Sequence, residues 1–320
     1  MPITVVGSIA FDTVKTPFGE RERMLGGAAV HFALAAAFCA EVHVVGPVGD
    51  DFGETELDVL RSRGVDVSDV ERIDGGRTFF WAGEYGWDLN SRETLDTQLG
   101  VFEGFQPKLS DASRASDVLF LANIQPELQL DVRAQLPAAR FVALDSMNLW
   151  IDIAREELAR AIASVDCVIL NDAELRQLTG KPNLVSAARE VLGWDAAEGT
   201  RGPSVIVAKQ GEYGAALITR EEFFALPAYP LETVIDPTGA GDTFAGGFVS
   251  YIAAHPEEET AGPLLRRAMA HATVLASFNV EEFGTERVQR LTGAEIRSRT
   301  DELGAMTRFE AGASELSLGA

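Results

Sequence analysis

The chain has 320 residues, of which 46% are apolar and 24% are charged. These values are ordinary for a globular protein that can bury a sizeable core, and they exclude disordered, collagen-like and membrane-spanning classes. The formal net charge of -22 excludes nucleic acid and anionic membranes as partners, because there is no basic surplus to displace counterions from phosphates. Any phosphate site must be local.

Six short apolar runs recur between patterns of helical periodicity. We expect strands in 3–9, 42–49, 117–123, 140–145, 167–171 and 204–209, and helices over 27–38, 54–63, 152–164, 240–254 and 262–278. Strands that are apolar on both faces and alternate with helices indicate a parallel sheet covered on both sides. The predicted fold is a single α/β domain over 1–320, with three α/β/α layers around a doubly wound, mostly parallel sheet.

One segment, 76–102, breaks this pattern, since aromatic and polar residues alternate around a turn-like stretch at 87–90. The alternation predicts a hairpin outside the parallel sheet. Together with 10–24 it would form a small β-sheet that acts as a lid, and two such lids could pair in a homodimer. An ordinary hairpin with one covered face is the alternative.

The chain ends carry few signals. The start, MPITVVGSIAFD, lacks the basic residues and apolar run of a signal peptide, and no stretch has the uncharged length needed to span a bilayer. We therefore expect a cytoplasmic protein. The last residues, 311–320, are small and polar and are expected to be poorly ordered.

The stretch 236–248, DPTGAGDTFAGGF, has the pattern of a loop that leads into a helix. The first amides of a helix have no internal partner, and glycines let the backbone approach a ligand, so Gly239, Ala240 and Gly241 predict a phosphate cradle. The stretch is not a P-loop, and Phe244 stands where the dinucleotide-binding pattern needs Gly or Ala.

Asp242 places a carboxylate inside this anion-attracting stretch. One interpretation is that it stabilises the start of the helix, as Asp does at helix N-termini. The other is that it accepts the proton of a phosphoryl-accepting hydroxyl while the cradle holds the transferring group. The second interpretation predicts a small-molecule kinase.

Six segments occur in order along the chain: GSIAFD, LGGAAVHFA, VGPVGDDFGETELDVLRSRGVDV, NDAE, VAKQGEYG and DPTGAGDTFAGGF. In these segments the sequence resembles the ribokinase-like carbohydrate kinases, or PfkB family, which includes nucleoside kinases. The resemblance implies ATP and Mg²⁺ as cofactors, Asp242 as general base, and Gly239, Ala240 and Gly241 as the anion hole. A monovalent cation is left open, because Pro237 replaces the Thr common in this motif.

The NDAE segment contains Asn171 and Glu174. The resemblance implies that this pair organises water around magnesium and the nucleotide phosphates, as suits a hard cation that keeps its waters. Asn followed three residues later by Glu is also the pattern of a capping box at the start of a helix.

Other residues are implied on the nucleotide side. Lys209 and the turn from Gly211 to Gly214 follow a predicted strand, where related kinases place a loop against ATP. His271 lies where the family often has Asn near the adenine pocket, and packing within a helix is the alternative.

On the substrate side, Asp12 matches the family's acid that hydrogen-bonds substrate hydroxyls, and Gly26 and Gly27 match its diglycine, which lets a helix N-terminus approach a sugar. Where ribokinases have Lys and Asn, this chain has Ala28 and His31. Two polar contacts are therefore changed, which argues against a ribokinase's specificity. His31 is either a substrate contact or a helix residue with one structural hydrogen bond.

Three further residues are substrate candidates. Trp81 could stack on a sugar or base, or pack within the hairpin, and Asn123 and Asn148 lie near strand ends, where ligands gather in doubly wound folds. We expect transfer of the ATP γ-phosphoryl group to a hydroxyl of a sugar or sugar-like molecule. A nucleoside or polyol acceptor, a non-catalytic sensor and a dinucleotide-dependent oxidoreductase are the alternatives.

Overall fold

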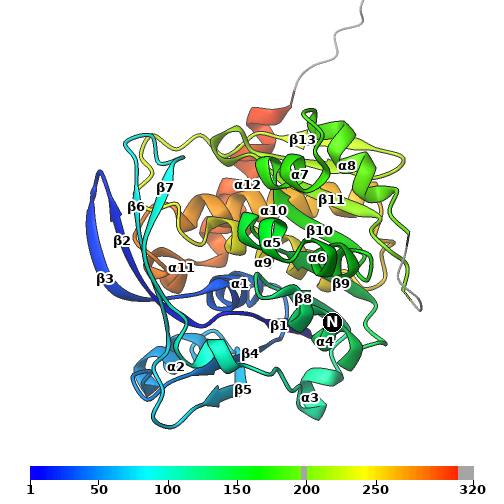
Figure 1. Cartoon of the computed structure of the whole chain (residues 1–320). Helices are drawn as coiled ribbons and strands as arrows, with labels where there is room; N and C mark the ends of the chain where they lie inside the picture. The colour runs from blue at the N-terminus through cyan, green and yellow to red at the C-terminus, as the bar shows by residue number, and fades with distance from the viewer. Residues whose placement is uncertain (196–199, 309–320) are drawn as a thin grey trace, which may run out of the picture.

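The computed structural model describes residues 1–195 and 200–308, and within them it contains a main sheet and a small sheet (Figure 1). The main sheet has the strand order β13-β12-β11-β10-β9-β8-β1-β4-β5. In chain order its strands are β1 (Ile3–Val6), β4 (Val42–Val48), β5 (Asp66–Arg72), β8 (Val118–Leu121), β9 (Phe141–Asp145), β10 (Cys167–Asn171), β11 (Val205–Lys209), β12 (Ala215–Ile218) and β13 (Phe223–Leu226).

The predicted mostly parallel sheet is confirmed. All strands from β1 to β11 in the main sheet pair in parallel, and β12 and β13 add an antiparallel edge. The six predicted runs all form strands. Strand β5, DVSDVER, was not predicted because it lies at the sheet edge, where its partly solvated position tolerates charged residues.

The strand order reverses beside β1. The chain runs from β1 outward to β4 and β5, returns to β8 on the other side of β1, and continues to the opposite edge. In open α/β sheets such a reversal leaves a crevice at the carboxyl ends of the strands. Ser8 and Asn123 follow β1 and β8 at this edge, so the crevice lies between their connections.

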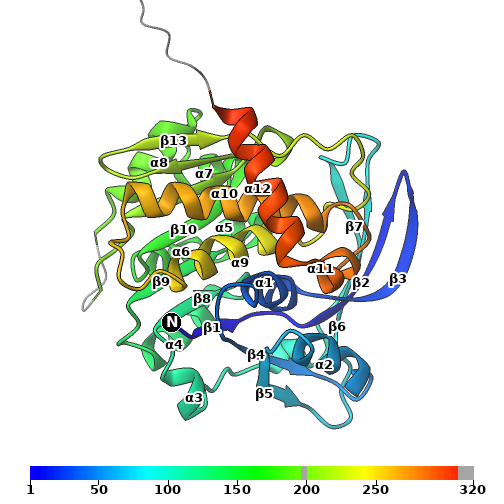
Figure 2. The same cartoon turned by 180° about the vertical axis from the view of Figure 1, so that it is seen from behind.

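Helices cover both faces of the main sheet (Figures 1 and 2). One face carries α1 (Ala28–Ala36), α2 (Glu54–Arg61), α9 (Ala240–Ala253), α10 (Gly262–Asn279), α11 (Glu286–Arg290) and α12 (Gly293–Thr307), and the other carries α4 (Pro126–Gln135), α5 (Asn148–Ile153), α6 (Arg155–Ile162), α7 (Asp172–Thr179) and α8 (Leu184–Leu192). Short turns of helix complete the connections: η1 (Gly100–Gly104), α3 (Asp111–Arg114) and η2 (Gly211–Tyr213).

Each face has its own apolar core, as a three-layer fold requires. One predicted helix, 152–164, is divided between α5 and α6. The division falls at Ala154, whose φ of -142° and ψ of 40° are not helical.

The small sheet consists of β2 (Ala10–Thr16), β3 (Gly19–Gly26), β6 (Phe79–Tyr85) and β7 (Arg92–Gln98), in the order β3-β2-β6-β7. The predicted hairpin is present as the antiparallel pair of β6 and β7, and β2 joins it by pairing in parallel with β6. Every residue of β7 is exposed. Closure of this sheet as a lid, and its pairing with a second copy, stay predictions.

Within the described ranges, no helix is long and apolar enough to cross a bilayer. The predicted poor order of 311–320 concerns residues that lie outside the described part of the chain.

Candidate active site

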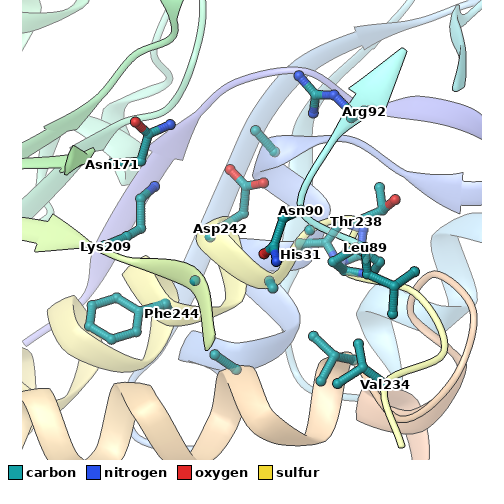
Figure 3. A pocket seen from close by; sticks show the side chains of 18 of the residues that line it. His31, Leu89, Asn90, Arg92, Asn171, Lys209, Val234, Thr238, Asp242 and Phe244 are labelled. Atoms are coloured by element: carbon teal, nitrogen blue, oxygen red, sulfur yellow. The ribbon is translucent and has the colours of Figure 1, made fainter. Parts of the chain in front are cut away.

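A cavity of about 1040 Å³ is lined by the carboxyl edge of the main sheet, the start of α9 and the inner side of the small sheet (Figure 3). It brings together most of the predicted site residues, although they are far apart in sequence. These are Asp12, Gly27, His31, Trp81, Asn123, Asn171, Glu174, Lys209, Gly211, Gly214, Gly239, Ala240, Gly241 and Asp242.

Three predicted site residues do not line this cavity. Asn148 is exposed as the first residue of α5. His271 is directed away from the cavity, where its Nε2 lies 3.3 Å from Cys39 Sγ and its ring packs against Tyr251. Its nucleotide contact, predicted from its position in the motif order, is therefore not supported by the geometry. Gly26 lies behind the cavity wall.

The predicted cradle is the start of α9. Gly239 is its N-terminal cap, with φ 72° and ψ 0° in the left-handed region that favours glycine. A Cβ there would lie 2.2 Å from the His31 ring, so the loop rests directly on that imidazole. The Ala240 amide donates to the Pro237 carbonyl at 3.2 Å, whereas the described chain provides no backbone partner for the Gly241 amide. The Gly241 amide is thus available to an anion.

The loop before α9 is fixed from both sides. The Asp236 carboxylate accepts one hydrogen bond from the Thr238 amide at 2.8 Å and another from the Gly284 amide at 2.9 Å. The Thr238 hydroxyl donates to the Tyr85 hydroxyl of β6 at 3.2 Å. Because both Asp236 oxygens accept hydrogen bonds, this carboxylate ties the loop to the segment at Gly284.

Asp242 is the third helical residue of α9 and makes no side-chain cap of that helix. Its pKa is raised to about 7, mainly by desolvation at the cavity floor and also by the nearby Asp145, while Lys209 acts in the opposite direction. A carboxyl group with a pKa near the working pH is suited to accept a proton. Figure 3 shows it between Asn171 and Lys209 on one side and Thr238 and Arg92 on the other.

Lys209, the last residue of β11, donates to Asp145 Oδ2 at 2.9 Å. Burial alone would lower the lysine's pKa, but Asp145, Glu174 and Asp242 raise it above its ordinary value. Sequence reasoning missed Asp145, although it is the last residue of β9. The rule that ligands gather at carboxyl ends of strands, applied to β9, could have found it.

Asn171 and Glu174 form a complete capping box at the start of α7. The Glu174 amide donates to Asn171 Oδ1 at 2.7 Å, and the Asn171 amide donates to Glu174 Oε2 at 2.8 Å. Both side chains also line the cavity. The two interpretations of NDAE are therefore compatible. Burial raises the pKa of Glu174 to about 7, and Lys209 partly offsets this shift.

At the other end of the cavity, Asp12 is buried on β2. Burial raises its pKa to about 7, although a hydrogen bond from the Gly27 backbone acts in the opposite direction. Gly26 makes room for this carboxyl group, since a Cβ there would lie 1.9 Å from Asp12 Oδ2. Gly26 thus acts behind Asp12 without touching the cavity.

The β6–β7 hairpin forms one wall of the cavity, and the sequence predicted only some of the residues in this wall. Trp81 lines it, and the guanidinium of Arg92 lies 5.2 Å from the centre of the Trp81 ring. Asn90 and Arg92 were missed because they lie in a polar turn and an exposed strand, which look like ordinary surface in sequence. Only the folded hairpin brings them to the cavity wall.

Phosphoryl transfer to a hydroxyl needs groups that hold the phosphates and a carboxyl group placed to accept the proton of the hydroxyl. The start of α9 and Asp242 offer both in one cavity. The fold and the cavity therefore define a small-molecule kinase. A comparison with protein-family models agrees, because the model described as "pfkB family carbohydrate kinase" matches residues 3–290. The chain belongs to this family.

The chain is 33% identical to the cytidine kinase of Thermococcus kodakarensis over 84% of this chain and 95% of that protein. Among solved structures, it is similar to the nucleoside kinase of Burkholderia thailandensis in complex with inosine (TM-score 0.73, 20% identity, 95% of this chain and 99% of that one). It is also similar to Arabidopsis thaliana ribokinase complexed with ribose and ATP (TM-score 0.72, 21% identity, 93% and 98%). The chain is thus a sugar or nucleoside kinase.

Proposed function

We propose that the protein transfers the γ-phosphoryl group of ATP to a ribose hydroxyl of a nucleoside, with Asp242 as general base. The observation that carries this proposal is the placement of two carboxyl groups with raised pKa values in one cavity. Asp242 lies at the phosphate cradle, and Asp12 lies at the wall formed by the small sheet. Asp242 is suited to take the proton of the reacting hydroxyl, and Asp12 is suited to bind other hydroxyls of the acceptor.

In this mechanism Asp242 takes the proton from the acceptor hydroxyl as its oxygen bonds to the γ-phosphorus. The bond from that phosphorus to the bridging oxygen of ADP breaks. The free amide of Gly241 and the field of the α9 N-terminus stabilise the charge on the transferring group. Lys209, 2.9 Å from Asp145, supplies a positive charge at the same end of the cavity.

The residues present fit a hydrated magnesium ion. Burial and the neighbouring Asp145 raise the pKa of Glu174, so a nearby dication would stabilise its carboxylate form. Asn171 and Glu174 would hold the ion through its waters, as Mg²⁺ prefers. Bound there, it would neutralise charge on the nucleotide phosphates. Within residues 1–195 and 200–308, no three His, Cys, Asp or Glu side chains are grouped to hold a metal directly.

The wall beyond Asp12 supports a nucleoside acceptor. Phe79, Trp81, Tyr85 and Leu89 line the cavity there, and Ala28 replaces a long polar side chain with a methyl group. A base offers a flat aromatic face to place against this wall, which is larger and more apolar than the C–H face of a free sugar. The 33% identity to a cytidine kinase supports the same acceptor class.

An ATP-consumption assay with Mg²⁺ and a panel of nucleosides, pentoses, hexoses and polyols tests the acceptor class. We expect nucleosides to give the highest kcat/KM. In Trp81→Ala we expect kcat/KM for nucleosides to fall about tenfold, since stacking of a base is worth about 1–3 kcal/mol, with little change for ribose.

Trp87→Ala is the matched control, because Trp87 is 89% exposed in the same hairpin. Higher kcat/KM for a free sugar than for every nucleoside would contradict the nucleoside proposal. Equal losses for sugars and nucleosides in Trp81→Ala would mean that Trp81 only supports the hairpin.

The rate should depend on pH through Asp242. Because its pKa is raised to about 7, we expect kcat/KM for the acceptor to be highest above pH 7. It should fall about tenfold per unit as pH decreases below that value, since a protonated carboxyl group cannot accept the proton. A profile from pH 5.5 to 9, with Asp12→Asn in parallel, checks this. If kcat/KM of Asp12→Asn no longer falls at low pH, the titration belongs to Asp12 instead.

A further inference from the structure

His31 lies on α1, and only 2% of the residue is exposed. Its Nδ1 is 3.1 Å from Asn279 Oδ1. Its Nε2 is buried and has no hydrogen-bond partner in the described parts of the chain, although the residue lines the cavity. Buried polar atoms in proteins almost always have a partner. An unpartnered ring nitrogen at a ligand cavity therefore points to a ligand group as its partner.

Asn279 determines which form of the imidazole is present. It is fully buried at the end of α10. Its Nδ2 donates to the Thr238 carbonyl at 2.8 Å, and its Oδ1 accepts from the Thr243 hydroxyl at 3.0 Å. These two contacts fix the orientation of the amide, so Oδ1 faces His31. Nδ1 must then carry the proton, and Nε2 is left with a lone pair.

Burial keeps this imidazole neutral. It lowers the pKa of His31 to about 4, while the hydrogen bond to Asn279 acts in the opposite direction. In the neutral form, Nε2 can accept a hydrogen bond and cannot donate one. A hydroxyl group can satisfy it, whereas a carbonyl or carboxylate oxygen cannot.

We propose that Asn279 is a positioning residue that holds His31 as an acceptor for one hydroxyl of the acceptor substrate and couples that hydroxyl to the phosphate cradle. This inference rests on the proposed function, because it assigns the hydroxyl to the same substrate. Asn279 contacts α1 through His31, the cradle loop through Thr238 and α9 through Thr243, the residue after Asp242.

The coupling follows from chain connectivity. The Thr238 carbonyl that Asn279 holds belongs to the peptide before Gly239, and a Cβ on Gly239 would lie 2.2 Å from the His31 ring. A hydroxyl bound to Nε2 strengthens the Nδ1–H bond to Asn279, because hydrogen bonds in a chain polarise one another. Loss of Asn279 should therefore disturb the cradle and reduce kcat, in addition to weakening acceptor binding.

The form of the imidazole can be measured without any substrate. Nitrogen-15 NMR of the full chain at pH 7.5 distinguishes the two neutral forms, and the His31 signals are identified by their absence in His31→Phe. We expect the Nδ1–H form in the wild-type protein and a change toward the Nε2–H form in Asn279→Ala. An Nε2–H form in the wild-type protein would overturn the assignment even if the kinase activity is as proposed.

Kinetics test the substrate contact. We expect the wild-type protein to prefer a ribonucleoside over one of its 2′-deoxy and 3′-deoxy analogues by at least tenfold, because a site built to bind a hydroxyl rejects the analogue that lacks it. In His31→Phe this preference should fall toward one. An unchanged preference would overturn the contact, and activity on nucleosides without any such preference would do the same.

Asn279→Ala should lower kcat about tenfold, because it removes the bond to the Thr238 carbonyl and small displacements of groups that hold the reacting atoms lower the rate. Ser250→Ala is the control for general destabilisation, because Ser250 is equally buried on α9, and its hydroxyl contacts Gly247 of its own helix and Cys39, neither of which belongs to the cradle. Unchanged kcat in Asn279→Ala, or the same loss in Ser250→Ala, would overturn the coupling. Failure of all nucleosides as substrates would refute the proposed function and the substrate contact, while the NMR result would still test the role of Asn279.

Discussion

Asp242→Asn reduces kcat by about 10²–10⁴-fold, the range for loss of a general base, and leaves nucleotide affinity near the wild-type value. Asn has nearly the same shape and cannot take the proton of the acceptor hydroxyl. The free Gly241 amide and the start of α9 remain in place, so the phosphate end of the cavity still binds ATP. Steady-state kinetics and calorimetric titration with Mg-ATP check the two parts of this result.

The stability of this variant separates the two interpretations of Asp242. The folded-state pKa of about 7 is raised from an ordinary value of 3.8. The contribution of this group to the free energy of unfolding is therefore fully present below pH 3.8, and it is lost as the pH rises through 7. Asn carries no charge, so the variant should melt at or above the wild-type temperature at pH 8.

Glu295→Ala is the matched control, because Glu295 occupies the third helical position of α12 and forms a capping box with Thr292, which Ala cannot form. It should lower the melting temperature without changing kcat. A drop in melting temperature for Asp242→Asn that matches its loss of activity would instead assign Asp242 to the stability of the helix start.

Gly239→Ala should lower kcat about 10²-fold, since a displacement of about 1 Å at reacting groups can have that effect. The substitution meets two obstacles. An L-residue is strained at φ 72°, by about 1–2 kcal/mol, and its Cβ would lie 2.2 Å from the His31 ring. The loop must move, and the amides of the cradle move with it.

Gly180→Ala controls for backbone strain alone. Gly180 has φ 69° at the end of α7, and a Cβ there would meet nothing within 4 Å. Both variants should lose a similar amount of stability from strain, but only Gly239→Ala should lose turnover. Equal kinetic effects in melting-matched samples would show that the contact with His31 does not position the cradle.

Local signals in the sequence predicted the main sheet, and they predicted the residues of the α9 start that line the cavity. The apolar runs form the strands because residues buried on both faces leave a continuous hydrophobic pattern. The cradle is a short contiguous stretch whose glycines and carboxylate are visible together. Asn171 and Glu174 satisfied both a structural and a functional pattern, and the structure contains the capping box in the cavity wall.

Residues defined by long-range contacts could not be predicted in this way. Asn279 is 248 positions from His31, and a lone Asn at the end of a helix carries no signal of its role. Arg92 lies on a strand whose residues are all exposed, so its sequence resembles a solvated edge. His271 matched a position in the motif order, but it lies on a face of α10 that packs against Cys39 and Tyr251 and not against the cavity.

The connection between the small sheet and α1 is a single residue, since β3 ends at Gly26 and α1 begins at Ala28. A linker of one residue has little slack, so at this connection a rotation of the small sheet would pivot beside the helix that carries His31. Asp12 lies on one side of this pivot and His31 on the other. The distance between these two groups therefore changes with the angle between the small sheet and α1. A molecule whose hydroxyls bind both groups would hold that angle fixed.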